Sequence, residues 1–366
     1  MQTLLSIPLP ALLACSVALA VALLLVLTQC WHGRYTMDSY EGIQKFHTQP
    51  TPRVGGIAVA SGVVAGCMFA APDKQALLGP LILAGIPAFA FGLLEDITKR
   101  VSVGTRLFAT MGCGVLGWAI TGYSITSANV WGLDWLLGFA LISVAFTAFA
   151  VGGIANAINI IDGFNGLSAG TVIIMLLAFG VMTSALGDPD LTHVCLILAG
   201  AMVGFLAINW PMGKIFLGDG GAYFIGFALA WLAVLLLVRH PEVSAWCPLL
   251  VCGYPILEVL FSIVRRRRRN LSPGEPDRLH LHSLVKRRLV RRLLPRSSSL
   301  VRNSTTGAVM WVAALLPAAV AVQWPTSTLH MALGFGLCAF LYLAVYARLT
   351  QFAWCFHPAT VTLKPA

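Results

Sequence analysis

Four acidic residues lie near the ends of apolar segments, in stretches rich in Gly or polar residues: Glu95, Asp96, Asp162 and Asp219. Asp162 also follows Asn156 and Asn159 at intervals of three residues, and this spacing places the three side chains on one helical face. Converging carboxylates suit a hard cation such as Mg²⁺, which is commonly shared between one or two Asp and substrate phosphates. With Arg, Lys and His available for phosphate oxygens, these residue types predict phosphoryl transfer.

The segments that must position these residues are long and apolar. Of 366 residues, 58% are hydrophobic and 10% charged, whereas about a quarter are charged in soluble domains. We therefore predict an all-α integral membrane protein. Eleven runs approach the length of about 17–25 residues that crosses a bilayer: 4–27, 54–71, 76–94, 104–122, 134–157, 166–186, 191–210, 221–238, 246–264, 307–323 and 328–348. The first is longer than a signal-peptide core, and no Lys or Arg precedes it, so we expect it to remain as a helix.

The basic residues predict the orientation. They follow the first run, which puts loop 28–53 in the cytoplasm, the N-terminus in the periplasm and, after eleven crossings, the C-terminus in the cytoplasm. Every Lys and Arg except Lys74 and Arg239 then lies on the cytoplasmic side, as do the four acids above, so an active site is expected there. Outer acids such as Asp188 are expected to be solvated turn residues. The net charge of +10 is mostly an orientation signal, and we expect membrane lipids rather than nucleic acid as partners.

Each signal has a structural alternative. EDITKR is a common charged helix end, the Asn-Asp face could form interhelical hydrogen bonds, and GDGG could be a turn. The five-arginine run from Arg265 is typical of a lipid-headgroup anchor. Glu258, inside the ninth run, should pair with a basic group or lie near the site, because an unpaired charge there is costly. His280 and His282 do not share a helix face, which disfavours zinc, and the nine Cys show no C-x-x-C spacing.

Taken together, the motifs resemble, in order, those of the polyprenyl-phosphate N-acetylhexosamine-1-phosphate transferases, a branch of glycosyltransferase family 4. The resemblance rests on five stretches between residues 47 and 283: HTQPTPRVGG, EDITK, NAINIIDGFNGL, FLGDGGA and PDRLHLHS. Three positions depart from the family pattern: Glu95 and Asn165 stand where many members have Asp, and Ser283 replaces the last His of the C-terminal motif. The last departure favours the sugar-1-phosphate branch over the peptidoglycan branch.

The resemblance implies a single catalytic domain, 1–366, in the bacterial inner membrane, with motif region 47–283, basic cytoplasmic loop 265–306 and two C-terminal helices within 307–348. It implies transfer of N-acetylhexosamine 1-phosphate from a UDP-N-acetylhexosamine to undecaprenyl phosphate, with Mg²⁺ or alternatively Mn²⁺. The implied catalytic residues are Glu95, Asp96, Asp162, His280 and His282; the substrate-binding residues are Arg53, Lys99, Asn156, Asn159, Asn165 and Arg278; the metal ligand is Asp219. Direct attack and a phospho-aspartyl intermediate both stay open, as do a homodimer and the identity of the sugar.

Two other function classes are compatible with parts of this pattern. A transporter or flippase could use the same carboxylates as a proton or cation site, but it predicts polar residues near mid-membrane in broken helices, whereas here they gather at one face. A catalytically inactive scaffold would explain Glu95, Asn165 and Ser283, yet Asp96, Asp162 and Asp219 all remain. The sequence therefore favours the enzyme.

Overall fold

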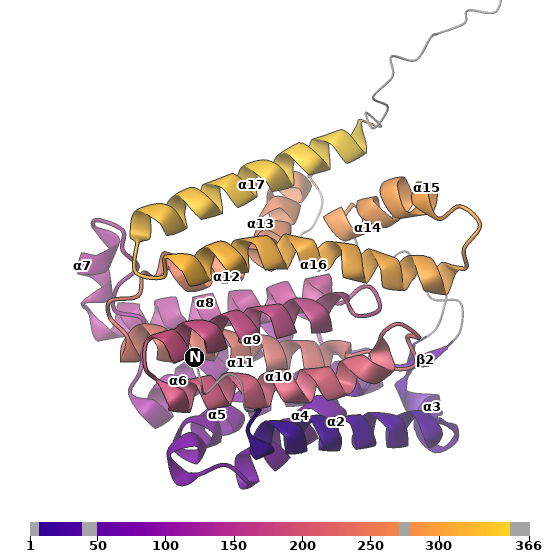
Figure 1. Ribbon diagram of the computed structural model, residues 1–366, viewed down its shortest axis with the longest axis horizontal. Helices are drawn as coiled ribbons and strands as arrows, with labels where there is room; N and C mark the ends of the chain where they lie inside the picture. The colour runs from indigo at the N-terminus through magenta and orange to yellow at the C-terminus, as the bar shows by residue number, and fades with distance from the viewer. Residues whose placement is uncertain (1–6, 39–49, 271–278, 352–366) are drawn as a thin grey trace, which may run out of the picture.

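The computed structural model describes residues 7–38, 50–270 and 279–351, which are almost entirely helical. Nine helices in this part are long and apolar enough to cross a membrane: α2 (Leu9–Leu27), α5 (Pro72–Thr98), α6 (Val103–Thr121), α8 (Ala140–Ile161), α9 (Leu167–Ala185), α10 (Pro189–Asn209), α11 (Gly218–Arg239), α16 (Ser299–Gln323) and α17 (Thr328–Thr350). Figure 1 shows most of them side by side in one bundle. The prediction of an all-α, multi-pass membrane protein is confirmed at this level.

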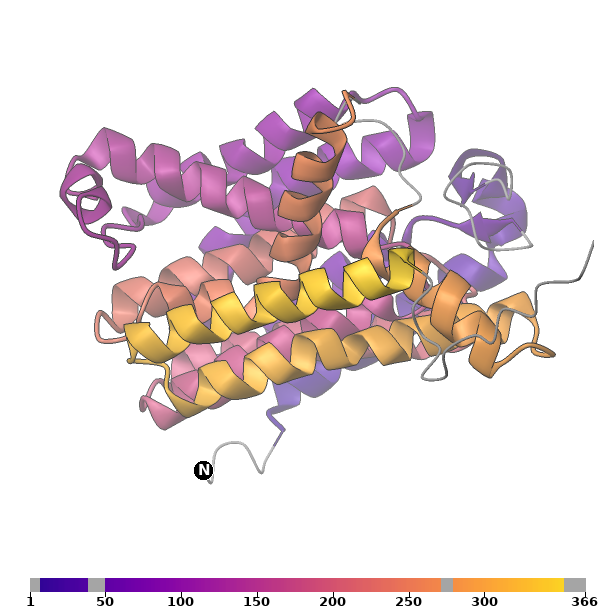
Figure 2. The same cartoon turned by 90° about the horizontal axis from the view of Figure 1, so that it is seen from above.

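The two remaining predicted runs have a different form. Run 54–71 is α4 (Gly55–Met68), of 14 residues, and run 246–264 is divided into α12 (Trp246–Val251) and α13 (Gly253–Arg267). Pro255 explains the break, because it has no N–H to donate to the carbonyl of Val251. Figure 2 shows α13 crossing the direction of α16 and α17.

Short elements complete the described chain: α3 (Gln29–Thr36), the antiparallel strands β1 (Met37–Asp38) and β2 (Thr51–Pro52), α7 (Leu133–Leu137), α14 (Leu281–Val285), the π-helical turn η1 (Lys286–Val290) and α15 (Arg291–Leu293). The described parts of predicted loop 265–306 are therefore largely helical. Ser298 caps the N-terminus of α16 by accepting from the Val301 N–H, so this helix begins eight residues before the apolar run at 307. Hydropathy finds the lipid-crossing part of a helix and misses such a polar extension.

Helix α11 lies at the centre of the bundle. Nearly all of its residues are buried, and it packs against α4, α5, α8 and α9, whereas most of α17 is exposed. Close packing at its N-terminus depends on glycine: a Cβ on Gly56 of α4 would lie 2.3 Å from the backbone nitrogen of Gly221. Several helix ends therefore converge on the first turn of α11, as small residues permit between membrane helices.

Candidate active site

Asp219 is the second residue of α11, and the local backbone fixes its position. Gly218 has a φ of +75°, and a Cβ there would lie 2.2 Å from the Arg53 carbonyl oxygen. Only glycine fits this turn without strain. The segment after β2 pairs with the chain before α11, since Phe216 donates its N–H to Pro52 and accepts from the N–H of Gly55. The N-terminal motif thus delivers Arg53 to the start of α11.

Asp96, in the last turn of α5, holds the same helix end. Its Oδ1 and Oδ2 each accept a backbone hydrogen bond, from Asp219 and Gly220 respectively, both at 2.9 Å. The side chain is 1% exposed, and the Nε of Arg53 lies 3.4 Å from Oδ1. A carboxylate at the positive end of a helix satisfies N–H groups that have no partner within the helix. Asp96 therefore positions Asp219, and both of its oxygens are used in doing so.

The Asp219 carboxylate collects three donors from other elements. It accepts from the Nη2 of Arg53 at 2.6 Å, from the Nδ2 of Asn159 at 3.1 Å, and from the Nη1 of Arg106. Asn159 comes from α8 and Arg106 from the first turn of α6. The carboxylate is almost fully buried. Two guanidinium groups beside two acids give a charge-balanced centre of the kind that can bind phosphate oxygens.

Arg106 was not predicted as a site residue, because the sequence presented it only as one cytoplasmic charge among many. Its guanidinium also lies over the Tyr223 ring, 6.0 Å from the centroid, so α11 holds it at two points. A signal was available: a lone Arg inside a membrane helix is costly unless it pairs, and the buried acid of GDGG is a natural partner.

Asp162 is the C-cap residue directly after α8, and its Oδ1 accepts from the hydroxyl of Ser168 at 2.9 Å. Burial raises the pKa of this carboxyl to about 6, although the Ser168 hydrogen bond and the charge of Arg53 oppose the shift. The next turn faces the C-terminal motif. A Cβ on Gly163 would lie 3.5 Å from the Nε2 of His282, and the Phe164 ring packs edge-on against that imidazole with centroids 5.5 Å apart.

The two histidines lie together. Their rings stack with centroids 5.3 Å apart. The expectation that they diverge assumed a helix, but His280 has extended backbone (φ −62°, ψ 147°) and only His282 is in α14. Glu258 of α13, fully buried, accepts from the His280 Nδ1 at 2.9 Å and from the Leu281 N–H. Of the two alternatives expected for Glu258, a basic partner or a place near the site, the structure confirms the basic partner, His280.

Asn156 and Asn165 make structural contacts. Asn156 donates to the Thr110 hydroxyl at 3.0 Å and so joins α8 to α6. Asn165 is buried and donates to the Ser304 hydroxyl at 3.2 Å, which fastens the loop after α8 to α16. Both side chains therefore contribute hydrogen bonds between helices, the ordinary role of Asn in membrane proteins. Their contact with substrate stays a prediction.

The remaining predicted residues lie at the end of α5 or beyond the described chain. Glu95 accepts from the Val101 N–H at 2.8 Å and so closes the turn between α5 and α6. Lys99 is exposed in a left-handed conformation at the end of α5. Arg278 falls outside the described residues. The structure thus joins Arg53, Asp96, Asn159 and Asp219 directly, with Asp162 and the histidine pair around the neighbouring loop.

The donor set tests the expected Mg²⁺. In this arrangement Asp219 already accepts from two guanidinium groups and an amide, and Asp96 accepts from two backbone N–H groups. Within the described ranges, no three His, Cys, Asp or Glu side chains are grouped to hold a metal. The residues therefore do not fit a directly bound ion as they stand, and Asp219 could take one only if Arg53 or Arg106 moved away.

Comparison with known proteins shows the family of this chain. Residues 78–237 match the model of glycosyl transferase family 4. The chain is 30% identical to the decaprenyl-phosphate N-acetylglucosaminephosphotransferase of Mycolicibacterium smegmatis, over 68% of each chain. It belongs to this family. It is also 29% identical to the probable undecaprenyl-phosphate N-acetylglucosaminyl 1-phosphate transferase of Bacillus subtilis, over 65% of this chain and 66% of that protein. A third similar protein, the undecaprenyl-phosphate alpha-N-acetylglucosaminyl 1-phosphate transferase of Yersinia pestis, is 28% identical over 67% and 68% of the two chains.

The chain spans about two thirds of the length of these relatives. As a member of glycosyl transferase family 4, it is a membrane phosphotransferase, and the transporter alternative is not favoured. The family match includes Asp96, Arg106 and Asp219 but ends before Glu258. Arg53 and the histidine pair thus join the site from outside the matched segment.

Proposed function

We propose that this protein transfers N-acetylhexosamine 1-phosphate from a UDP-sugar to undecaprenyl phosphate. A phosphate oxygen of the lipid attacks the β-phosphorus of the UDP-sugar. The bond from that phosphorus to the bridging oxygen breaks, and UMP leaves with the electron pair. One phosphoanhydride replaces another, so no ATP is required. The barrier is largely electrostatic, because two anions must approach each other.

The observation that carries the proposal is the Asp219 centre, where Arg53, Arg106 and Asn159 converge on one carboxylate at the end of α11. Guanidinium groups bind phosphate oxygens with two parallel hydrogen bonds. We assign Arg53 and Arg106 to the diphosphate, with Asp96 positioning the helix end. Since both Asp96 oxygens accept backbone hydrogen bonds, the arrangement favours direct transfer over a phospho-aspartyl intermediate on that residue.

Glu95, Asp162 and the histidine pair surround this centre in the proposal. His280 and His282 would donate to the sugar phosphate, held in place by Glu258. Asp162 would orient the donor beside them. Lys99, Asn156, Asn165 and Arg278 remain proposed substrate contacts.

A divalent cation is part of the proposal, Mg²⁺ or alternatively Mn²⁺. It would supply charge neutralisation of the diphosphate. Asp219 is the residue that would hold it, once its guanidinium partners have turned to the substrate. This part of the proposal rests on the family resemblance alone, because three donors already contact the Asp219 carboxylate, and metal titration tests it.

The proposed setting is the bacterial inner membrane, with a single catalytic domain, eleven crossings, a periplasmic N-terminus and the reaction at the cytoplasmic face. The distribution of Lys and Arg supports this orientation. It requires α4 and the α12–α13 pair to complete the crossings. A homodimer stays part of the proposal as an alternative to a monomer.

The test is UMP release by the purified full-length protein, using a panel of UDP-N-acetylhexosamines with undecaprenyl phosphate and Mg²⁺. Asp219→Asn serves as the inactive variant. The matched control is Glu242→Gln, which changes a carboxylate that follows the opposite end of α11. We expect lipid-dependent and metal-dependent release that only the Asp219 substitution abolishes. Absence of release with every donor from folded protein would refute the proposal.

A further inference from the structure

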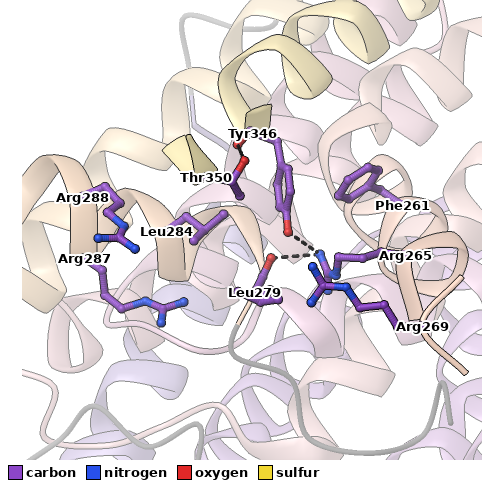
Figure 3. Close-up of a pocket in the computed structure, with 9 residues that line it drawn as sticks. All are labelled: Phe261, Arg265, Arg269, Leu279, Leu284, Arg287, Arg288, Tyr346 and Thr350. Atoms are coloured by element: carbon purple, nitrogen blue, oxygen red, sulfur yellow. Dashed lines mark hydrogen bonds between the residues drawn. The ribbon is translucent and has the colours of Figure 1, made fainter. Parts of the chain in front are cut away.

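A separate pocket of about 450 Å³ lies beside the ends of α13 and α17. Four arginines line it: Arg265, Arg269, Arg287 and Arg288. Figure 3 shows the first two on one side and the last two on the other, with Tyr346 and aliphatic side chains between them. Its lining contains no carboxylate and none of the residues around Asp219. The pocket therefore has the charge and size to bind an anion of moderate size.

Arg265 forms the base of this arginine pocket. Its side chain is buried, with the guanidinium 5.6 Å from the ring centroids of both Phe261 and Tyr346. It donates to the Leu279 carbonyl at 2.9 Å and to the Tyr346 hydroxyl at 3.1 Å. Arg269 and Arg287 are exposed. A fixed cation at the base with exposed cations around it can enclose a phosphate group from several directions.

The surroundings identify the source of that phosphate. Tyr346 and Thr350 are in the last turns of α17, and most of that helix is exposed, including large apolar residues such as Leu337 and Phe340. In a membrane protein an exposed apolar helix faces acyl chains. A headgroup in the arginine pocket would therefore stand at the end of a lipid-covered surface, next to a cluster of cations that anionic lipids attract.

We propose that the arginine pocket binds the phosphate headgroup of an anionic membrane phospholipid, whose acyl chains lie along α17. This site is distinct from the Asp219 centre and does not depend on the proposed function. It also reaches the active-site loop: Arg265 holds the carbonyl of Leu279, the residue before His280. A bound headgroup would thus help to fix the segment that carries the histidine pair.

The five-arginine run supplies a matched control within one chain. Arg269→Gln with Arg287→Gln removes two exposed charges from the pocket. Arg267→Gln with Arg268→Gln removes two exposed charges that do not line it. Both double variants lower the net charge equally, and neither changes a buried residue. In neutral detergent containing phosphatidylcholine, both double variants should have the melting temperature of the wild type, which would show that both are folded.

The measurement is the dissociation constant of phosphatidylglycerol for the full-length protein in neutral detergent, obtained by native mass spectrometry, with phosphatidylcholine as the zwitterionic comparison. We expect the pocket variant to bind phosphatidylglycerol at least about tenfold more weakly and the control variant to change about twofold or less. An equal loss in both variants would overturn the proposal in favour of a general basic surface.

Two further arms distinguish the source of the phosphate. Millimolar inorganic phosphate should fail to displace phosphatidylglycerol; full displacement would mean that a free phosphate is the ligand. Undecaprenyl phosphate should show no dependence on the pocket arginines. If it alone lost affinity in the pocket variant, the pocket would belong to the lipid acceptor and the proposal would be wrong. Each of these experiments measures the binding of a lipid or of phosphate, and none of them requires sugar transfer.

Discussion

The strongest test of the site concerns Asp96, which the structure places in a positioning role. Asp96→Asn keeps the shape of the side chain and one acceptor oxygen, but its amide group would face the backbone N–H of either Asp219 or Gly220. One buried N–H then has no acceptor, and the first turn of α11 loses its counter-charge. Activity should fall because the carboxylate of Asp219 is no longer fixed against Arg53.

The magnitude follows from the contacts that are lost. A hydrogen bond to a charged group contributes about 1.5–3 kcal/mol, and an anion at a partly buried helix N-terminus up to about 2 kcal/mol. Removing the charge also relieves its desolvation, which offsets part of this sum. We therefore expect a net destabilisation of about 2 kcal/mol. At roughly 2 °C per kcal/mol for a large domain, the melting temperature should fall by about 4 °C.

The assay is thermal unfolding of the full-length protein in detergent, followed by intrinsic fluorescence, beside UMP release. Glu95→Gln is the matched control. The Glu95 carboxylate neighbours Asp96 in the sequence, but it is only half-buried and accepts one backbone hydrogen bond, from Val101. It should change the melting temperature by about 1 °C or less. If Asp96→Asn abolished activity while leaving the melting temperature unchanged, the carboxylate would act on the substrate directly and the positioning argument would fail.

Three further outcomes follow from the same contacts. Burial raises the pKa of Asp162 to about 6. The wild-type protein should therefore lose stability relative to Asp162→Asn as the pH rises from about 4 through 6. A difference in melting temperature that does not change with pH would contradict this. Arg106→Gln should lower kcat/KM roughly 10²- to 10³-fold yet tighten Mn²⁺ binding, measured by electron paramagnetic resonance without substrate, because Asp219 loses a competing cation. Arg239→Leu leaves buried Asp188 without its bidentate partner (2.6 and 2.9 Å) and should cost about 1–3 kcal/mol of stability, with activity per folded molecule unchanged.

The sequence was sufficient for those parts of the fold and site that depend on local pattern. Apolar run length located the long helices, and the cost of a lone buried carboxylate predicted that Glu258 would either be paired with a basic group or lie near the site. Asn159 lies on the predicted polar face and does reach Asp219. In each case, a short stretch of chain contains the information that decides the structure.

Features that depend on distant segments were not predictable in the same way. Asp188 was expected to be a solvated turn residue, but it is buried beside Arg239, which is 51 residues away in the chain. Asn165 contacts Ser304 across a separation of 139 residues. No periodicity reports such pairs, because they arise only when helices pack. The break at Cys252 had a local signal in Pro255, which a run-length criterion ignores.

Charge balance at the active site links these observations. Two carboxylates, Asp96 and Asp219, lie against two guanidinium groups, Arg53 and Arg106, so the centre has little net charge before substrate binds. A UDP-sugar and a lipid phosphate both add negative charge. In the proposed mechanism, a cation bound at Asp219 would balance its charge and leave Arg53 and Arg106 free to turn to the phosphates. On this argument metal and donor should bind cooperatively, and Mn²⁺ affinity should rise when a UDP-sugar is present in the wild type but much less in Arg106→Gln.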